Sequence, residues 1–282
     1  QTTKGNLYSW GENKRGQCGT GNCKKVIIPT KIEIQGLSTD DSIKQISTLN
    51  KFNIILTNHG KVYGWGDNET LQCGIKERRI VKQPTEIPIP SSTEKIEVIE
   101  IAKNEAIAVT YQNSCYIWGR CIINRYYTHI WPIKSLFPLH QALHFQSTTL
   151  ARKIMTSTNI NDLDLEGRSP IFIACDTGNE EMVKEFLQKK VSIDINLHSY
   201  HPNYKSLVDL ASSKGHLSIV QLLLQNKIKG TPFSIIRAIQ NGYTEIVKVL
   251  LTYQEDLYAV RDSKDNTLLS IACYFSHLDI VK

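Results

Sequence analysis

The residues best suited to chemistry in this chain of 282 residues are its cysteines and histidines, of which it has seven and eight. Cys18 and Cys23, and further along Cys115 and Cys121, are spaced as zinc ligands could be, but no second pair or histidine follows at a zinc-finger spacing. An odd number of cysteines without a secretory signal segment argues against a complete disulfide framework. It favours a reducing, intracellular compartment, and we expect no metal site.

His140 and His144 stand four residues apart and could share one face of a helix. The residues between them lack the glutamate that a zinc protease uses as its general base, so a structural or solvent-facing role fits better. Glu180 and Glu181 fit the first turn of a helix, where negative charge is favourable. No glycine-rich phosphate cradle, nucleophile elbow or kinase signature appears. The sequence therefore predicts no catalytic site and no cofactor, and we expect that the protein is not an enzyme.

The elements that position these residues follow from two internal repeats, the first with a period of 55 residues. Residues 7–13 (LYSWGEN) return as 62–68 (VYGWGDN), and 17–19 (QCG) return as 72–74. A third start, CYIWG at 115–119, lies 53 residues after the second, and the match then decays. Short β-rich runs joined by turns predict strands, and units of this length are typical of β-propeller blades.

The pattern Y-x-W-G-x-N-x-x-G-Q-x-G over residues 8–19 resembles the repeat of the regulator-of-chromosome-condensation family. Members of that family form seven-bladed propellers, so the resemblance implies about two and a half blades over residues 1–120. Two features depart from the family pattern. Phe52 and Glu105 stand where a histidine is usual, and Leu71 replaces a glycine in the second unit.

From Asp164 onward the sequence repeats as pairs of short helices. Ser169 is suited to cap the first helix with Pro170 at its first position, and Gly178 is suited to end that helix. Apolar residues recur at helical spacing in the segments that follow. The series D-x-x-G-x-S-P, then a small-residue pair, then Gly-Asn or Gly-His resembles the ankyrin repeat over about residues 162–282. The repeat spacings of 37 and then 27 residues are irregular, and the fourth copy is truncated.

The predicted fold class is therefore multidomain β + α, a partial β-propeller followed by an α-helical ankyrin solenoid. We assign residues 1–120 to the propeller and 121–160 to a basic linker whose segment Leu139 to Met155 forms a capping helix. Residues 161–282 hold about four ankyrin repeats. The chain starts without Met and ends in mid-pattern, which suggests a fragment. Because two and a half blades cannot close a ring and ankyrin arrays need terminal capping, we expect further blades before it and more repeats after it. The resemblance to proteins that combine these repeats implies a further effector module, such as a ubiquitin-ligase adaptor domain, outside the fragment.

The net charge of +6 divides into +4 over residues 1–120, +4 over 121–160 and −2 over 161–282. Nucleic-acid binders concentrate Lys and Arg on one face, and charge this diffuse does not indicate such binding. No run of about 18 apolar residues is present, so we expect no membrane span.

Binding surfaces remain as the expected function, and we predict an intracellular, more cytoplasmic than nuclear, scaffold or adaptor that binds protein partners. The candidate contact residues are aromatic and histidine side chains of the loop fingers: Tyr200, His201, Tyr204, Tyr253 and Tyr258. Tyr is enriched at interaction hot spots, although these rings could equally pack on neighbouring fingers. The propeller resemblance implies two alternatives, a guanine-nucleotide exchange factor for a small GTPase and a chromatin-associated module.

Overall fold

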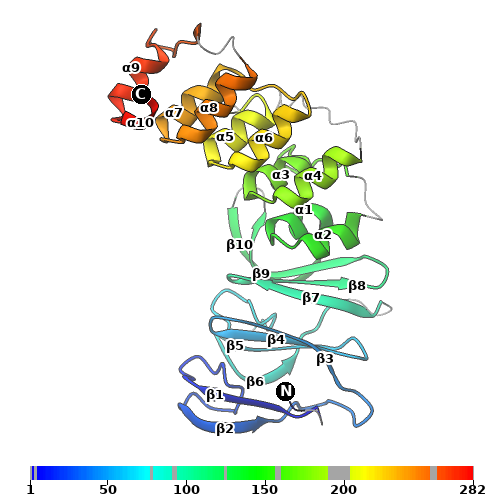
Figure 1. Ribbon diagram of the computed structural model, residues 1–282. Coiled ribbons are helices and arrows are strands. Elements are labelled where there is room, and N and C mark those ends of the chain that lie inside the picture. The colour runs from blue at the N-terminus through cyan, green and yellow to red at the C-terminus, as the bar shows by residue number, and fades with distance from the viewer. Residues whose placement is uncertain are drawn as a thin grey trace. The chain divides into compact units, whose positions relative to one another are not determined.

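The computed structural model describes residues 2, 5–76, 79–90, 94–123, 126–155, 160–189, 204–254 and 259–281. The chain divides into two compact units, a strand unit at Gln1–Pro138 and a helical unit at Leu139–Lys282 (Figure 1). Strands and helices therefore occur in the predicted order along the chain.

Antiparallel strands form three sheets in the described part of the strand unit. Within each four-stranded sheet the strands pair in chain order, which is the arrangement of a propeller blade. The first sheet contains β1 (Leu7–Gly11) and β2 (Val26–Ile32); the second contains β3 (Ile43–Leu49), β4 (Phe52–Thr57), β5 (Val62–Asp67) and β6 (Ile80–Glu86); the third contains β7 (Ile96–Ala102), β8 (Glu105–Thr110), β9 (Cys115–Ile123) and β10 (Tyr126–Lys134).

The strand unit extends past residue 120, where the predicted linker was to begin. β9 runs to Ile123, and β10 pairs with it antiparallel from Tyr126↔Ile123 to Lys134↔Tyr116. The repeat motif decays at this point, but β10 is rich in aromatic and β-branched residues, which favour strands. The boundary between the two units lies at residues 138 and 139 instead.

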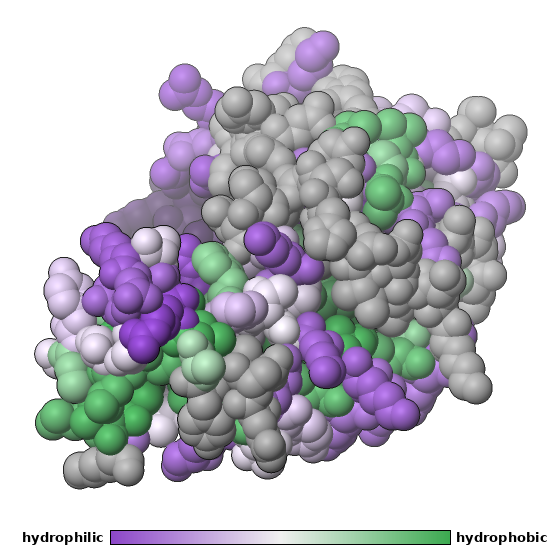
Figure 2. Space-filling view, turned by 90° about the horizontal axis from the view of Figure 1, so that it is seen from above, coloured by the Kyte–Doolittle hydropathy of each residue, from purple (hydrophilic) through white to green (hydrophobic). Residues whose placement is uncertain are grey.

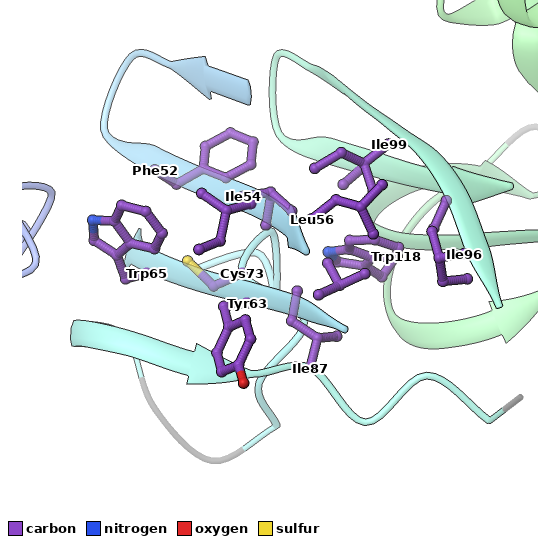
Figure 3. Packing of buried hydrophobic residues seen from close by; sticks show 14 of the residues in the cluster. Phe52, Ile54, Leu56, Tyr63, Trp65, Cys73, Ile87, Ile96, Ile99 and Trp118 are labelled. Carbon is purple, nitrogen blue, oxygen red and sulfur yellow. The ribbon is translucent and has the colours of Figure 1, made fainter. Parts of the chain in front are cut away.

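A hydrophobic core joins the second and third sheets, with Ile54, Leu56 and Trp118 wholly buried (Figure 3). The tryptophan of each of these two sheets donates its indole N–H to a turn of the preceding sheet. Trp65 Nε1 lies 3.0 Å from the Gln17 carbonyl oxygen, and Trp118 Nε1 lies 3.1 Å from that of Gln72. The 55-residue repeat thus encodes the joint between neighbouring blades.

The asparagine of the W-G-x-N motif organises the turn that presents this carbonyl. Asn13 is buried and accepts a hydrogen bond from the Cys18 backbone N–H at 2.9 Å, and Asn68 does the same for Cys73. Gly66 adopts a φ of 110°, and a β-carbon there would collide with the Lys51 carbonyl, which is why glycine follows the tryptophan.

The helical unit consists of short antiparallel helix pairs. Inner helices α3, α5, α7 and α9 contact one another in sequence, as do outer helices α4, α6, α8 and α10. The bounds are α1 (Pro138–His144), α2 (Thr148–Met155), α3 (Pro170–Thr177), α4 (Glu180–Gln188), α5 (Leu207–Lys214), α6 (Leu217–Gln225), α7 (Pro232–Gln240), α8 (Thr244–Tyr253), α9 (Leu268–Tyr274) and α10 (Leu278–Val281).

Local signals set the helix ends much as predicted. Gly178 and Gly215 adopt the left-handed conformation after α3 and α5, and Thr231 caps α7 through its hydroxyl. Ser169 occupies the N-cap position of α3, but its side chain makes no capping hydrogen bond, contrary to expectation. Proline at the first helical position supplies the start signal there instead.

The segment expected to form one capping helix contains two, α1 and α2. In α2, Leu150 and Ile154 are buried, and Arg152 forms ion pairs with Glu181 at 2.9 Å and Glu185 at 2.8 Å. Both acidic partners belong to α4, so α2 packs against the first ankyrin pair. Each helix that the structure describes is too short or too polar to cross a lipid bilayer.

Candidate protein-binding groove

The helical unit contains an open groove of about 820 Å³ along α7 and α9, closed on one side by the turn at residues 261–266. We call it the α7–α9 groove. It runs over the inner helices, the row that an ankyrin array presents to its surroundings. Its lining combines positive charges with exposed apolar rings.

Four cationic side chains line this groove: Lys205, Arg237, Arg261 and Lys264. The Arg237 guanidinium lies 4.7 Å from the centre of the Phe233 ring and donates to Gln240 Oε1 at 3.3 Å. Arg261 lies 3.6 Å from Asp265, and both of these side chains are exposed. We refer to the four as the groove cations.

Three rings form the apolar part of the same groove: Phe233, Tyr274 and Phe275. Tyr274 is 83% exposed and Phe275 41% exposed, and their rings meet edge to face at 5.1 Å. On the side of the helical unit where α9 and α10 lie, hydrophobic and strongly hydrophilic groups adjoin (Figure 2). Large exposed rings are unusual on a soluble surface and mark sites of association. We refer to the three as the groove rings.

Asp262 carries the one carboxylate that lines the groove among the described residues. Groups of its own turn donate hydrogen bonds to this carboxylate. Its oxygens accept hydrogen bonds from the backbone N–H groups of Lys264 and Asn266 at 2.8 and 2.9 Å and from the Asn266 amide at 3.0 Å. These hydrogen bonds, led by those from Asn266, lower the pKa of Asp262. Asp262 therefore shapes the groove wall.

A buried carboxylate positions the other rim. Asp209 has no exposed surface and accepts hydrogen bonds from the Lys205 N–H at 3.0 Å and from the Thr231 N–H and hydroxyl, each at 2.9 Å. The short connection before α7 is fixed further by Gln254, whose amide bonds both the N–H and the carbonyl of Gly230. The fold thus holds Lys205 beside the N-terminus of α7.

Of the sequence-predicted contact residues, Tyr200, His201 and Tyr258 lie outside the described residues. Tyr204 is half-buried and directly precedes Lys205, while Tyr253 is 49% exposed at the end of α8. Neither of these two tyrosines lines the α7–α9 groove. Their role in binding stays a prediction.

Sequence reasoning missed the groove residues because they come from four separate segments that only the fold brings together. One signal was available in the fourth repeat. Tyr274 and Phe275 are consecutive large rings at the end of an inner helix, and one face of a helix this short cannot bury both.

Several of the thiols and imidazoles that suggested chemistry are buried, although Cys23 is only half-buried. Cys18, Cys73, Cys115 and Cys175 are buried, and burial raises the pKa of all four. Cys273, which holds the same position in α9 as Cys175 in α3, is exposed.

His140 is buried, and its Nε2 lies 2.8 Å from the Arg168 carbonyl oxygen. Burial lowers the pKa of His140, and it lowers the pKa of His144 to about 4, with Arg168 adding to the effect on His144. Within the described ranges, no cluster of three or more His, Cys, Asp or Glu side chains could hold a metal ion.

A smaller recess of about 340 Å³ lies beside β1 in the strand unit. It contains Trp10, which occupies the same repeat position as Trp65 and Trp118 but is 63% exposed. Tyr8 and Ile46 also line this recess, with 38% and 37% of their surfaces exposed. The recess has no cationic lining comparable to that of the α7–α9 groove.

Comparison with protein families agrees with these units. A model of ankyrin repeats matches residues 139–233 and 210–282, which together span just over half of the chain. The chain belongs to the ankyrin-repeat family. Its strand unit carries regulator of chromosome condensation (RCC1) repeats, matched at residues 4–55 and 59–103. The predicted fold class and the predicted order of the two repeat types are confirmed.

Several known proteins are similar in sequence to parts of this ankyrin-repeat chain. The ultraviolet-B receptor UVR8 of Arabidopsis thaliana is 33% identical over 116 residues, 41% of this chain and 26% of that protein. Protein RCC2 of Homo sapiens is 37% identical over 87 residues, 30% of this chain and 16% of that protein. The chain thus spans about a quarter or less of the length of these two relatives.

Among solved structures, human WBSCR16 aligns with 49% of this chain and 35% of its own, with a TM-score of 0.43 and 21% identity. Prp20p of Saccharomyces cerevisiae aligns with 47% of this chain and 34% of its own, with a TM-score of 0.42. The family matches establish that both units consist of repeats of the kind that mediate protein–protein interaction.

Proposed function

We propose that this protein is a non-enzymatic adaptor that binds a protein partner through the α7–α9 groove of its ankyrin repeats. The observation that carries the proposal is the exposure of the groove rings beside the groove cations on the inner face of the array. Interaction hot spots combine aromatic residues and arginine in this way.

The adaptor proposal also accounts for the reactive residues. Cys115 and Cys175 are buried thiols with raised pKa values, and a nucleophile must be a thiolate to react. His140 is engaged by a backbone carbonyl. We place the adaptor inside the cell, in the cytoplasm, because free cysteines suit a reducing compartment.

The strand unit supports a second binding role. The alternatives of a guanine-nucleotide exchange factor for a small GTPase and a chromatin-associated module come from the RCC1 repeats of this unit. This chain spans 26% of the length of UVR8 and 16% of that of RCC2. The alternatives rank behind the adaptor role because the recess beside β1, at about 340 Å³, is smaller than the α7–α9 groove and has no cationic lining.

The adaptor proposal is tested by capture of partners from native cell extract on the immobilised full chain, analysed by mass spectrometry. We expect the double variant Tyr274→Ala with Phe275→Ala to lose a reproducible subset of captured proteins. Both side chains are exposed, so their loss should leave the circular-dichroism spectrum unchanged.

Two further variants make this experiment decisive. Leu163→Ala with Leu165→Ala removes exposed apolar side chains outside the groove and serves as the matched control. The triple variant Tyr200→Ala, His201→Ala and Tyr204→Ala tests the sequence-predicted finger. Unchanged capture by the groove variant, with the finger variant losing partners, would move the binding site to the finger.

A further inference from the structure

The charge of the α7–α9 groove differs from that of the unit around it. Residues 139–282 contain 15 Lys and Arg and 15 Asp and Glu, so the helical unit as a whole is neutral. The groove has four cations and one carboxylate. Its positive charge is therefore a local property of this surface and can discriminate between partners.

The four groove cations outnumber the carboxylates beside them in the described part of the chain. Arg261 pairs with Asp265, and the charge of Lys264 acts on Asp262. The carboxylate of Asp262 is engaged by three hydrogen bonds from its own turn. An incoming carboxylate would thus meet positive charge that these two carboxylates only partly compensate.

Arg237 is held ready for such a ligand. Its guanidinium stacks over the Phe233 ring, and one nitrogen is held by Gln240, which restricts the side chain before binding. Guanidinium groups present a fork of N–H donors that matches both oxygens of a carboxylate. Restriction before binding reduces the entropy lost on association.

The groove rings add a requirement that a small anion does not meet. Tyr274 and Phe275 expose apolar surface directly beside the cations, so the fitting ligand has carboxylates and an apolar side chain at short spacing. A volume of about 820 Å³ lies within the range of pockets that enclose a compact ligand. It suits a few side chains of an extended chain better than a globular domain.

We propose that the α7–α9 groove binds an acidic, extended segment of a partner protein, with carboxylates on the groove cations and an apolar side chain on the groove rings. This inference rests on the proposed adaptor function and names the chemistry of the partner. Affinity falls as ionic strength rises, because salt screens exposed charges. Salt does not screen the apolar contact, so part of the affinity persists at high salt.

The test uses random dodecapeptides displayed on phage and selected on the immobilised full-length chain. We expect the selected peptides to be enriched in Asp and Glu together with Leu, Phe or Trp. A selected peptide is then synthesised with a fluorescent label, and its dissociation constant is measured by anisotropy. We expect at least a tenfold weaker affinity at about 500 mM NaCl than at about 50 mM NaCl.

Charge reversal provides the matched comparison. The variant Arg237→Glu with Lys264→Glu changes two groove cations, and Lys184→Glu with Lys229→Glu makes the same charge change at exposed positions outside the groove. We expect the first variant to weaken peptide affinity about tenfold or more and the second to leave it within twofold. Circular dichroism and melting temperature establish that both variants are folded.

The outcomes separate the acidic-segment proposal from the adaptor proposal beneath it. Peptides that bind equally well to the Arg237→Glu, Lys264→Glu variant, or that lack acidic enrichment, overturn the acidic-segment proposal. If such peptides still lose affinity in the Tyr274→Ala, Phe275→Ala variant, the groove remains a protein-binding site. If no selected peptide depends on the groove rings or cations, both proposals fail.

Discussion

At the scale of single residues, the most consequential side chain of the helical unit is Asp209. It is wholly buried and satisfies three donors, two on Thr231 and one on Lys205. The substitution Asp209→Ala removes the charged acceptor of these part-buried donors, and a hydrogen bond to a charged group contributes about 1.5–3 kcal/mol. We expect a loss of about 3 kcal/mol in the free energy of unfolding, measured by urea titration at 222 nm.

A matched substitution calibrates this prediction. Asp162 is exposed, so Asp162→Ala should change the free energy of unfolding by less than about 0.5 kcal/mol. Asp209→Asn keeps one acceptor oxygen and should fall between the two. If Asp209→Ala unfolds at the same urea concentration as Asp162→Ala, the buried carboxylate does not stabilise the rim of the groove.

Burial of His144 predicts a dependence of stability on pH. Its pKa is about 4 in the folded chain, lowered first by burial and then by Arg168, against about 6.5 when unfolded. Between these values the unfolded state binds a proton that the folded state does not, so stability falls as pH falls from about 6.5 toward 4. From pH 7 to pH 5 the loss is about 2 kcal/mol.

The neighbouring groups contribute in known directions. His140 faces the same region, and burial lowers its pKa, so it adds to the loss. Asp164 has a pKa below its ordinary value, and hence it titrates below pH 5. The variant His144→Gln should therefore retain at least about 1 kcal/mol more of its pH 7 stability at pH 5. An unaltered pH dependence in this variant would place the titrating groups elsewhere.

At the scale of elements, the repeated tryptophan leads to a prediction for which another copy of the repeat provides the control. Trp118 is wholly buried and donates to the Gln72 carbonyl, whereas Trp10 holds the same repeat position and is 63% exposed. Trp118→Phe leaves a cavity and an unpaired carbonyl, and we expect a loss of about 2–3 kcal/mol in the stability of the strand unit. Trp10→Phe should change it by less than about 0.5 kcal/mol.

Thermal unfolding followed at 218 nm, a wavelength sensitive to strands, measures both variants. The comparison removes the effect of residue type, because both changes replace tryptophan with phenylalanine at one motif position. Equal losses would mean that position in the repeat, rather than the contact with Gln72, determines stability.

Some structural features of these elements could be predicted from the sequence, and others could not. The W-G-x-N motif was predictable because Asn13 and Asn68 serve the same turn in each copy, so local chemistry repeats with the fold. β10 was not predicted, because the repeat motif decays before it; only its aromatic and β-branched composition indicated a strand, and its pairing with β9 depends on contacts that no motif encodes. The α7–α9 groove was likewise not predictable, since Lys205 and Lys264 are distant in sequence and line the same groove only after the helix pairs stack.

At the scale of the whole molecule, each unit has its own hydrophobic core, and the ankyrin array begins with α1 and α2 rather than with the first recognisable repeat. Seven apolar side chains of these two helices are buried: Leu139, Ala142, Leu143, Leu150, Ala151, Ile154 and Met155. Burying one large aliphatic side chain contributes about 1.5–3 kcal/mol before conformational entropy is subtracted. The terminal pair of a solenoid is thus part of its cooperative unit.

This assignment predicts different behaviour for two fragments of the helical unit. Residues 139–282 should unfold cooperatively, whereas residues 161–282 lack α1 and α2, the packing of α2 on α4 and the ion pairs of Arg152. We expect the shorter fragment to be less stable by at least about 3 kcal/mol in urea titration. Leu150→Ala in the longer fragment should reproduce about 2–4 kcal/mol of that loss through its cavity. Equal stability of the two fragments would show that the array begins at the first repeat motif and that α1 and α2 are only attached to it.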